Sequence, residues 1–107
     1  MIPLAIQPWQ IICGEVSPEQ ILDIRQPDLF TRAHIPGAVN VPYGEVQDRG
    51  PAALAPDQTV LVVDPGGARA AEMAVWLRGQ GFAAAYLEGG MAAWTGDLTR
   101  PKRRRRS

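Results

Sequence analysis

The residues best suited to chemistry form a short glycine-containing loop between a strongly apolar run and a helix-like segment. They are Asp64, Pro65, Gly66, Gly67, Ala68 and Arg69. Ligands of open α/β sheets bind beyond the carboxyl ends of the strands. A glycine-containing turn that enters a helix can direct its backbone N–H groups at an anion. The loop therefore predicts an anion-binding cradle, with a plain turn as the alternative interpretation.

Individual loop residues refine this expectation. Gly66 and Gly67 permit the backbone angles that such a cradle needs, and the guanidinium of Arg69 would add a charged fork. Pro65 has no N–H group, so one donor is missing from the loop. No cluster of histidine, cysteine or acidic residues has the spacing of a metal site, and we expect neither a metal nor a cofactor.

Two strong local patterns flank the loop. The β-branched run at residues 59–63 predicts a central strand that is buried on both faces. Residues 69–78 predict a helix, which the glycines at 79 and 81 end. The apolar face of this helix has the expected 3–4 spacing and consists of Ala70, Met73, Ala74 and Leu77.

Weaker elements alternate along the rest of the chain. We expect strands at residues 5–7, 21–24, 38–41 and 83–87, and helices at 8–13, 28–33 and 90–94, with a short helix inside the loop 43–57. This alternation is typical of an α/β domain with a mainly parallel sheet. Trp9 and Trp76 are expected in or near the core, with Trp76 partly exposed. Cys13, at the end of the first helix, is expected to be a small buried apolar residue.

Composition limits the class of protein. The chain has 107 residues, of which 46% are hydrophobic and 21% charged, which fits one globular domain. A single cysteine excludes an internal disulfide. There is no apolar run of the roughly 18 residues that span a bilayer and no signal-like start. We therefore expect a soluble, cytoplasmic domain over residues 1–99.

Net charge is unevenly distributed. Residues 1–99 hold five arginines and eleven acidic residues, a charge of −6, and a basic tail follows at residues 100–107. Such a tail is typically solvated and disordered. It is either a handle for nucleic acid, a membrane surface or an acidic partner, or only a solvated end. Its charged residues are Arg100, Lys102, Arg103, Arg104, Arg105 and Arg106.

Three motifs in succession resemble the signatures of a rhodanese-homology domain. They are Asp23-Ile-Arg25, the run from His34 to Pro42 (HIPGAVNVP), and the run from Leu87 to Trp94 (LEGGMAAW). The resemblance covers about residues 4–98. It implies a five-stranded, mostly parallel sheet with helices on both faces. It also implies that residues 64–69 are the active-site loop, which reads Cys-x-x-Gly-x-Arg in active members.

The loop departs from the family pattern at its first position. Gly67 and Arg69 match, but Asp64 stands where active members have the cysteine whose persulfide carries sulfur. A carboxylate cannot form a persulfide, and its charge would oppose an anionic substrate. We expect Asp64 to accept the N–H bonds of the loop itself, pairing with Arg69 and capping the helix.

The resemblance gives structural roles to other residues. Asp23 and Arg25 are expected to support the loop by orienting the neighbouring turns with hydrogen bonds. His34 is expected to stabilise its own turn rather than to act as a base. Met91 and Trp94 are expected to pack over the edge of the sheet.

The functional interpretation that follows is a rhodanese-like domain that lacks catalysis and acts as a binding or regulatory module for a protein partner. One alternative is a sulfurtransferase with weak or altered activity, for which Cys13 is the candidate replacement for the missing nucleophile. Asp64 acting as a nucleophile is disfavoured because no partner carboxylate or lysine accompanies it. A second alternative is electrostatic binding of nucleic acid, membrane or an acidic partner by the basic tail.

Overall fold

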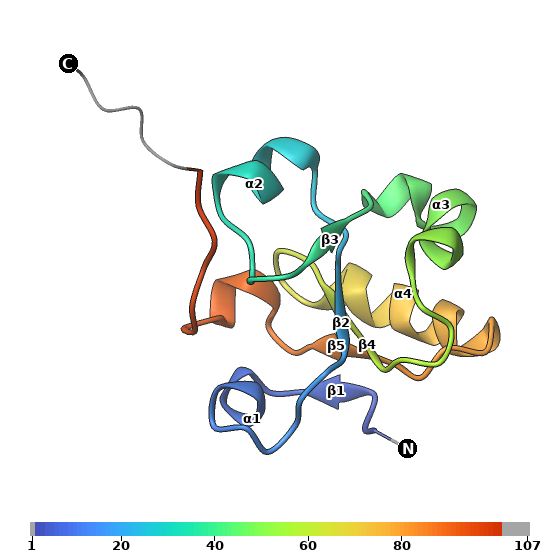
Figure 1. Ribbon diagram of the computed structural model, residues 1–107, viewed down its shortest axis with the longest axis horizontal. Coiled ribbons are helices and arrows are strands. Elements are labelled where there is room, and N and C mark those ends of the chain that lie inside the picture. The colour runs from blue at the N-terminus through green and yellow to red at the C-terminus, as the bar shows by residue number, and fades with distance from the viewer. Residues whose placement is uncertain (1, 102–107) are drawn as a thin grey trace.

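The sheet has five short strands, and every pair of neighbours is parallel (Figure 1). The computed structural model describes residues 2–101. The strand order is β1-β5-β4-β2-β3. The strands are β1 (Ala5–Ile6), β2 (Gln20–Asp23), β3 (Val39–Asn40), β4 (Val60–Val63) and β5 (Ala84–Leu87). The expected five-stranded α/β architecture is confirmed.

Among the described residues, four α-helices and one 3₁₀ segment connect the strands, and a second 3₁₀ segment follows β5. They are α1 (Pro8–Ile12), α2 (Pro27–Arg32), η1 (Tyr43–Glu45), α3 (Val46–Ala53), α4 (Ala68–Gly79) and η2 (Gly90–Ala93). The region expected to hold one short helix within a loop contains η1 followed directly by α3. The segment at 90–94, expected to be helical, has the tighter 3₁₀ form.

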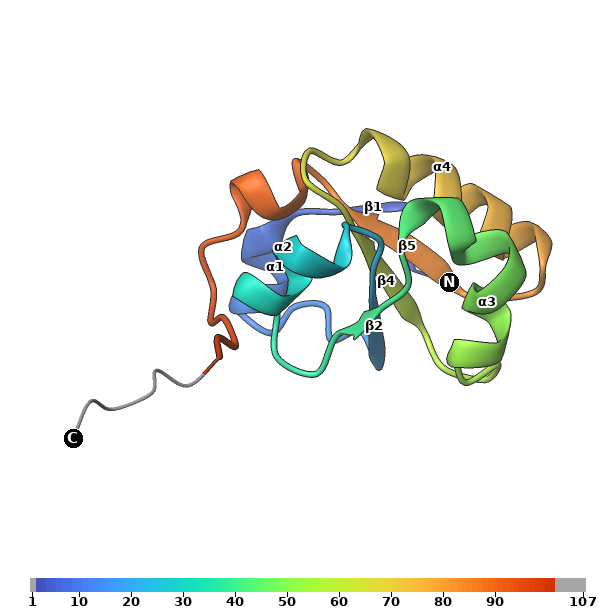
Figure 2. The same cartoon turned by 90° about the horizontal axis from the view of Figure 1, so that it is seen from above.

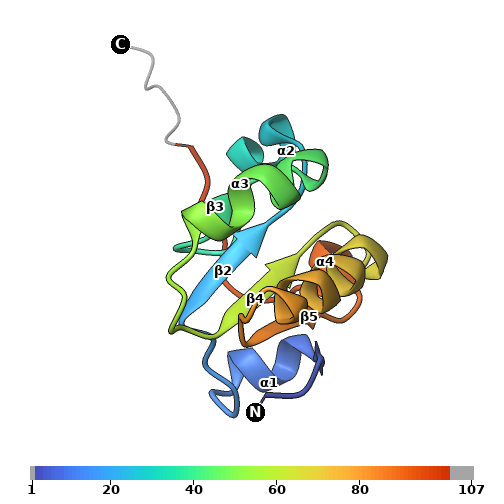
Figure 3. The same ribbon diagram turned by 90° about the vertical axis from the view of Figure 1, so that its right-hand side faces the viewer.

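Each face of the sheet has its own apolar cluster. Val46 of α3 and the apolar stripe of α4 pack on one face with the strand residues Leu22, Val60 and Val62. On the other face, Leu61 and Val63 pack with Ile11 of α1 and with Met91 and Trp94 around η2. Figure 2 shows α1 and α3 on opposite sides of the sheet, and in Figure 3 α3 and α4 lie on the same side.

The two strong local patterns are confirmed. All four residues of β4 are buried, as expected for a strand that is covered on both faces. The buried residues of α4 are the predicted stripe of Ala70, Met73, Ala74 and Leu77. Trp76 is partly buried and packs against the same cluster. These two elements are predictable from the sequence because β4 must bury both of its faces and α4 must bury one, which requires a regular pattern of apolar residues.

The first helix contradicts two expectations. Trp9 is 57% exposed, and Cys13 is exposed rather than buried. A helix of five residues makes only about 1.4 turns, so it presents a narrow face to the sheet. Pro8, which is buried, and Ile11, which is partly buried, occupy that face, while Ile12 is 50% exposed. The apolar residues at 9, 12 and 13 therefore point away from the core.

The C-terminal part of the described chain is tied to the segment after α2. The N–H of His34 donates to Thr99 O at 3.0 Å, and the N–H of Thr99 donates to His34 O at 2.7 Å. Arg100 and Pro101 follow and are exposed. The remainder of the predicted basic tail lies outside the described residues. Within residues 2–101, none of the helices is long and apolar enough to cross a membrane.

Candidate functional site

The side chain of Asp64 fills the turn between β4 and α4. Asp64 is 3% exposed. One of its carboxylate oxygens, Oδ1, accepts a hydrogen bond from the N–H of Gly67. The other, Oδ2, accepts from the N–H of Arg69 at 3.0 Å and from that of Ala70 at 3.2 Å. These are N–H groups of the kind that leave the first turn of a helix without intrahelical partners, so the carboxylate caps α4, as the sequence predicts.

The segment after β5 packs against the loop from the other side, with Gly90 at the point of closest approach. The N–H of Met91 donates to Asp64 O at 2.8 Å, and that of Ala92 donates to Pro65 O at 3.1 Å. A Cβ atom on Gly90 would lie 2.5 Å from Asp64 O and 2.6 Å from the N atom of Gly66. Gly90 also has a φ of +60°. The backbone can approach this closely only because residue 90 has no side chain.

Within the loop itself, Gly67 is the residue whose backbone is in the left-handed region. Its φ is +105°, whereas Gly66 does not have a positive φ. A Cβ on Gly67 would lie 3.1 Å from the N atom of Gly89, while one on Gly66 would meet nothing within 4 Å. Of the two glycines that the sequence offers, only Gly67 is required by both backbone angle and packing.

Arg69 does not pair with Asp64 through its side chain, which corrects the sequence expectation. Its guanidinium carbon lies 4.6 Å from the centre of the Tyr43 ring, a cation–π contact. The hydroxyl of Tyr43 in turn donates to the carboxylate of Glu72, with distances of 2.9 and 2.8 Å to its two oxygens. The backbone N–H of Arg69 therefore binds Asp64 within the loop, while its charged side chain lies outside the loop, over Tyr43.

The Tyr43 hydroxyl has an altered acidity. The hydrogen bond to Glu72 raises the pKa of Tyr43 above its ordinary value, because the hydroxyl can donate this bond only while it is protonated. Desolvation and the charge of Glu72 also raise this pKa, and the charge of Arg69 lowers it. The hydroxyl therefore keeps its proton, and with it the hydrogen bond to Glu72, to a higher pH than an ordinary tyrosine.

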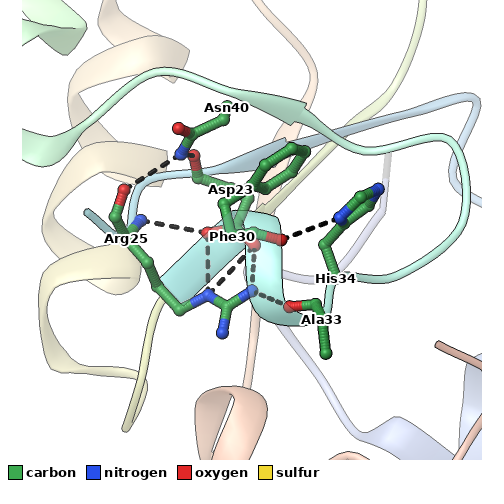
Figure 4. A network of polar contacts seen from close by, with 6 residues as sticks. All are labelled: Asp23, Arg25, Phe30, Ala33, His34 and Asn40. Atoms are coloured by element: carbon green, nitrogen blue, oxygen red, sulfur yellow. Dashed lines mark hydrogen bonds and ion pairs between the residues drawn. The ribbon is translucent and has the colours of Figure 1, made fainter. Parts of the chain in front are cut away.

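Asp23 and Arg25 form a buried ion pair at the end of β2 (Figure 4). The distance from Arg25 Nη2 to Asp23 Oδ2 is 2.8 Å, and the two side chains are 9% and 1% exposed. Arg25 Nη2 also donates to Ala33 O at 2.6 Å. Asn40 Nδ2 donates to Asp23 O and Arg25 O, both at 2.9 Å. The pair thus joins β2 to the end of α2 and to β3.

This network holds the end of α2 and strand β3, and in the described structure it makes no direct bond to the loop at residues 64–69, which the sequence predicts it to support. The hydrogen bonds of the two side chains go to each other and to residue 33, and within residues 2–101 none of them reaches residues 64–69. The connection to the loop is made by the backbone, where the N–H of Ile24 donates to Val63 O at 2.9 Å. Asp23 and Arg25 support the loop only through the sheet.

His34 has the structural surroundings that its turn motif predicts. Its Nδ1 atom lies 2.9 Å from Phe30 O, and its ring stacks on that of Phe30 with centroids 3.9 Å apart (Figure 4). Met91 and Trp94 pack against the apolar cluster on one face of the sheet. His34 thus fixes the turn after α2, and Met91 and Trp94 attach η2 to the sheet.

The single thiol belongs to a different element from the loop. Cys13 caps the C-terminal end of α1, and its Sγ lies 3.7 Å from Gln10 O. The loop N–H groups of Gly67, Arg69 and Ala70 are directed at Asp64 instead. Across the described part of the chain, no group of three or more histidine, cysteine or acidic side chains is placed to hold a metal.

Sequence reasoning missed three contributors to this region. Gly90 enters the sequence analysis only within a family motif, and Tyr43 and Glu72 do not enter it. The pair of glycines shortly after β5 is a usable signal, because glycine at a strand often marks a close backbone approach. Nothing in the local sequence links residue 43 to residue 72, since they meet only when α4 packs beside η1.

Comparison with known sequences identifies the family. The "Rhodanese-like domain" family matches residues 11–97. "Putative sulfur carrier protein YrkF" of Bacillus subtilis is 37% identical over 78 residues, which cover 71% of this chain and 41% of that protein. "Putative sulfurtransferase YtwF" of the same organism is 30% identical over 82 residues, which cover 77% of this chain and 78% of that protein.

Another relative, "Uncharacterized protein YibN" of Escherichia coli K12, is 35% identical over 80 residues, which cover 72% of this chain and 56% of that protein. The chain thus spans about half the length of the first relatives that it matches, YrkF and YibN.

Solved structures show the same fold. A rhodanese-like domain protein from Staphylococcus aureus superposes with a TM-score of 0.81 at 26% identity, covering 94% of this chain and 100% of that one. A rhodanese-related protein from Thermoplasma volcanium also gives a TM-score of 0.81, at 21% identity, covering 91% of this chain and 98% of that one. With the family match over residues 11–97, these similarities show that the chain belongs to the rhodanese-like domain family.

Proposed function

We propose that this chain is a rhodanese-like domain that lacks sulfurtransferase activity and serves as a binding or regulatory module. The observation that supports the proposal most directly is the position of Asp64. Its buried carboxylate accepts hydrogen bonds from the N–H groups of three loop residues, Gly67, Arg69 and Ala70. The N–H groups that could bind an anionic substrate are therefore already occupied by a carboxylate of the chain itself.

The chemistry of sulfur transfer explains why this position matters. In active relatives of this kind, a thiolate attacks the sulfane sulfur of thiosulfate, the sulfur–sulfur bond of thiosulfate breaks, and sulfite leaves. Cyanide then attacks the terminal sulfur of the persulfide, and the thiolate is regenerated as thiocyanate departs. Both steps require a sulfur nucleophile. A carboxylate oxygen cannot form the persulfide.

The electrostatics of the loop work in the same direction. An anionic substrate would need the N–H groups that Asp64 already occupies, and it would meet a like charge at that point. Pro65 supplies no N–H donor to compensate. We infer that thiosulfate does not bind productively in this loop.

A second candidate function is sulfur transfer through Cys13. It is favoured by the exposure of this thiol and by the sulfur-related names of two relatives. It is opposed by the position of the thiol, which is on α1 and is not among the residues of the loop. The two candidates differ in which side chain must be present for activity.

A thiosulfate:cyanide sulfurtransferase assay distinguishes them. We expect no thiocyanate above background from the unmodified protein or from Cys13→Ser. Asp64→Cys should gain sulfur transfer or a persulfide detectable by mass spectrometry, because Gly67, Arg69 and the length of the loop match the pattern of active members. Asp64→Ser is the matched control, with a side chain of similar shape that holds no sulfur. Activity of the unmodified protein that disappears in Cys13→Ser would overturn the proposal.

A further inference from the structure

A small pocket lies beside the loop, between the segment η1–α3 and helix α4. Its volume is about 190 Å³, and its lining consists of Tyr43, Gly44, Gln47, Glu72 and Met73. One water needs only about 15 Å³ of such space, so the pocket has room for a side chain of a bound peptide. Among the residues that line it, the charged one at neutral pH is Glu72.

Glu72 has no cationic partner among residues 2–101. The ion pairs of this part of the chain join Arg25 to Asp23 and Arg49 to Glu45. Arg69 lies three positions before Glu72 on α4, a spacing at which opposite charges commonly pair. Its guanidinium instead lies over the Tyr43 ring. The negative charge of Glu72 is therefore not neutralised by an ion pair in this region.

The carboxylate of Glu72 is nevertheless held in place. The Tyr43 hydroxyl lies 2.9 and 2.8 Å from its two oxygens. A hydroxyl donates a single hydrogen, whereas a carboxylate can accept about four hydrogen bonds. A tyrosine hydroxyl holds that hydrogen at neutral pH. An oriented carboxylate with unused acceptor sites thus borders the pocket.

We propose that this pocket binds a lysine or arginine side chain of a basic peptide segment, with Glu72 as the counter-ion and Tyr43 and Met73 as the walls. The inference rests on the binding role proposed above and names the chemistry of the partner. Tyr43 and Met73 suit the aliphatic part of such a side chain, because long cationic residues bury their methylene groups while the charged end stays hydrated. The charge of −6 on residues 1–99 favours the same class of ligand.

Arg69 defines the competing possibility. Its positive charge lies next to the pocket, over the Tyr43 ring, and would attract an anion instead of a cation. The pocket lining itself carries only the negative charge of Glu72, so we favour the cationic ligand. Binding of an anion at Arg69 is then an outcome that the experiment must be able to detect.

The test is a titration of the full chain with an acetylated and amidated peptide that has the sequence of residues 100–107. Binding is monitored by fluorescence anisotropy and by the amide chemical shifts of the protein. We expect shifts at Gly44 and Gln47. Glu72→Gln should raise the Kd about tenfold, the loss of a charge-assisted hydrogen bond, while the glutamine can still accept from Tyr43. Asp57→Asn removes the same charge from an exposed residue outside the pocket and should change the Kd less than about twofold.

Two results would overturn the inference. One is an equal loss of affinity in Glu72→Gln and Asp57→Asn, which would mean that only net charge is sensed. The other is binding of inorganic phosphate beside Tyr43 that disappears in Arg69→Gln while peptide binding is absent. Neither result depends on the sulfurtransferase assay, so failure of this inference and failure of the proposed function are separable.

The source of the basic segment is decided by a second arm. The chain's own candidates are Lys102, Arg103, Arg104, Arg105 and Arg106. If they compete for the pocket, a full-length variant with these five residues replaced by glutamine will bind the added peptide more tightly. An unchanged, Glu72-dependent Kd will assign the site to a basic segment of another protein.

Discussion

Oδ2 of Asp64 lies 3.0 Å from the backbone nitrogen of Arg69, so this arginine stabilises the carboxylate with its amide group and not with its guanidinium. The side chain of Arg69 is free to lie over Tyr43. One residue therefore joins two features, the capped loop and the neighbouring pocket. Predictions about the loop and about the pocket can consequently be tested with separate substitutions.

Replacing Asp64 should destabilise the domain even if the residue has no catalytic role. Asp64→Ala removes the acceptor of three N–H groups, two of which belong to the buried residues Gly67 and Ala70. We expect the free energy of unfolding to fall by about 2–3 kcal/mol, as measured by urea denaturation. Asp64→Asn keeps one oxygen acceptor and should lose less. A change below about 0.5 kcal/mol would contradict the capping role.

Gly90 should tolerate no side chain. In Gly90→Ala the new methyl group would lie 2.5 Å from Asp64 O, at a backbone φ of +60°. We expect a loss of about 2–4 kcal/mol in the free energy of unfolding, from a steric clash combined with backbone strain. Gly79→Ala is the matched control, because a Cβ there meets nothing within 4 Å at the end of α4. It should be neutral or stabilise by up to about 1 kcal/mol. Equal effects of the two substitutions would refute the close-packing argument.

The ion pair of Arg25 should matter far more than the exposed pair of Arg49. Arg25→Ala leaves Asp23, which is 1% exposed, without its cation, at a cost of about 3–5 kcal/mol. The side chains of Arg49 and Glu45 are 58% and 48% exposed, and Arg49→Ala should cost less than about 1 kcal/mol. Thermal and urea unfolding of the two variants measure the difference, and similar losses would show that burial does not govern the strength of these pairs.

Tyr43 should titrate above its ordinary range, and Glu72 should be the reason. In a Tyr86→Phe background the ultraviolet absorbance of tyrosinate reports Tyr43 alone. The pKa should be above 10.0, the ordinary value for tyrosine, and Glu72→Gln should lower it. Because the folded state holds this proton more tightly than the unfolded state, the stabilising contribution is present below about pH 10 and is lost as the pH rises through the folded pKa. A pKa that does not respond to Glu72→Gln would contradict the assigned cause.

Features that depend on neighbours along the chain were determined by the sequence alone. The buried strand β4, the apolar stripe of α4 and the capping role of Asp64 all follow from residues within a few positions of one another. The reason is physical: a strand or a long helix must bury a regular pattern of side chains, and a cap bonds to N–H groups of the next turn. The family motifs extended these local predictions to the order of the elements.

Features that depend on which surfaces meet were decided only by the tertiary structure. Gly90 packs against Asp64, and Tyr43 contacts Arg69 and Glu72. The two residues of each contact are more than 20 positions apart in the sequence, so no helical or strand periodicity predicts these contacts. The same reason explains the errors at Trp9 and Cys13. Their apolar character predicted burial, but α1 has only five residues and offers the sheet a single narrow face, which Pro8 and Ile11 fill. Hydrophobicity favours burial, and the geometry of packing determines which side chains obtain it.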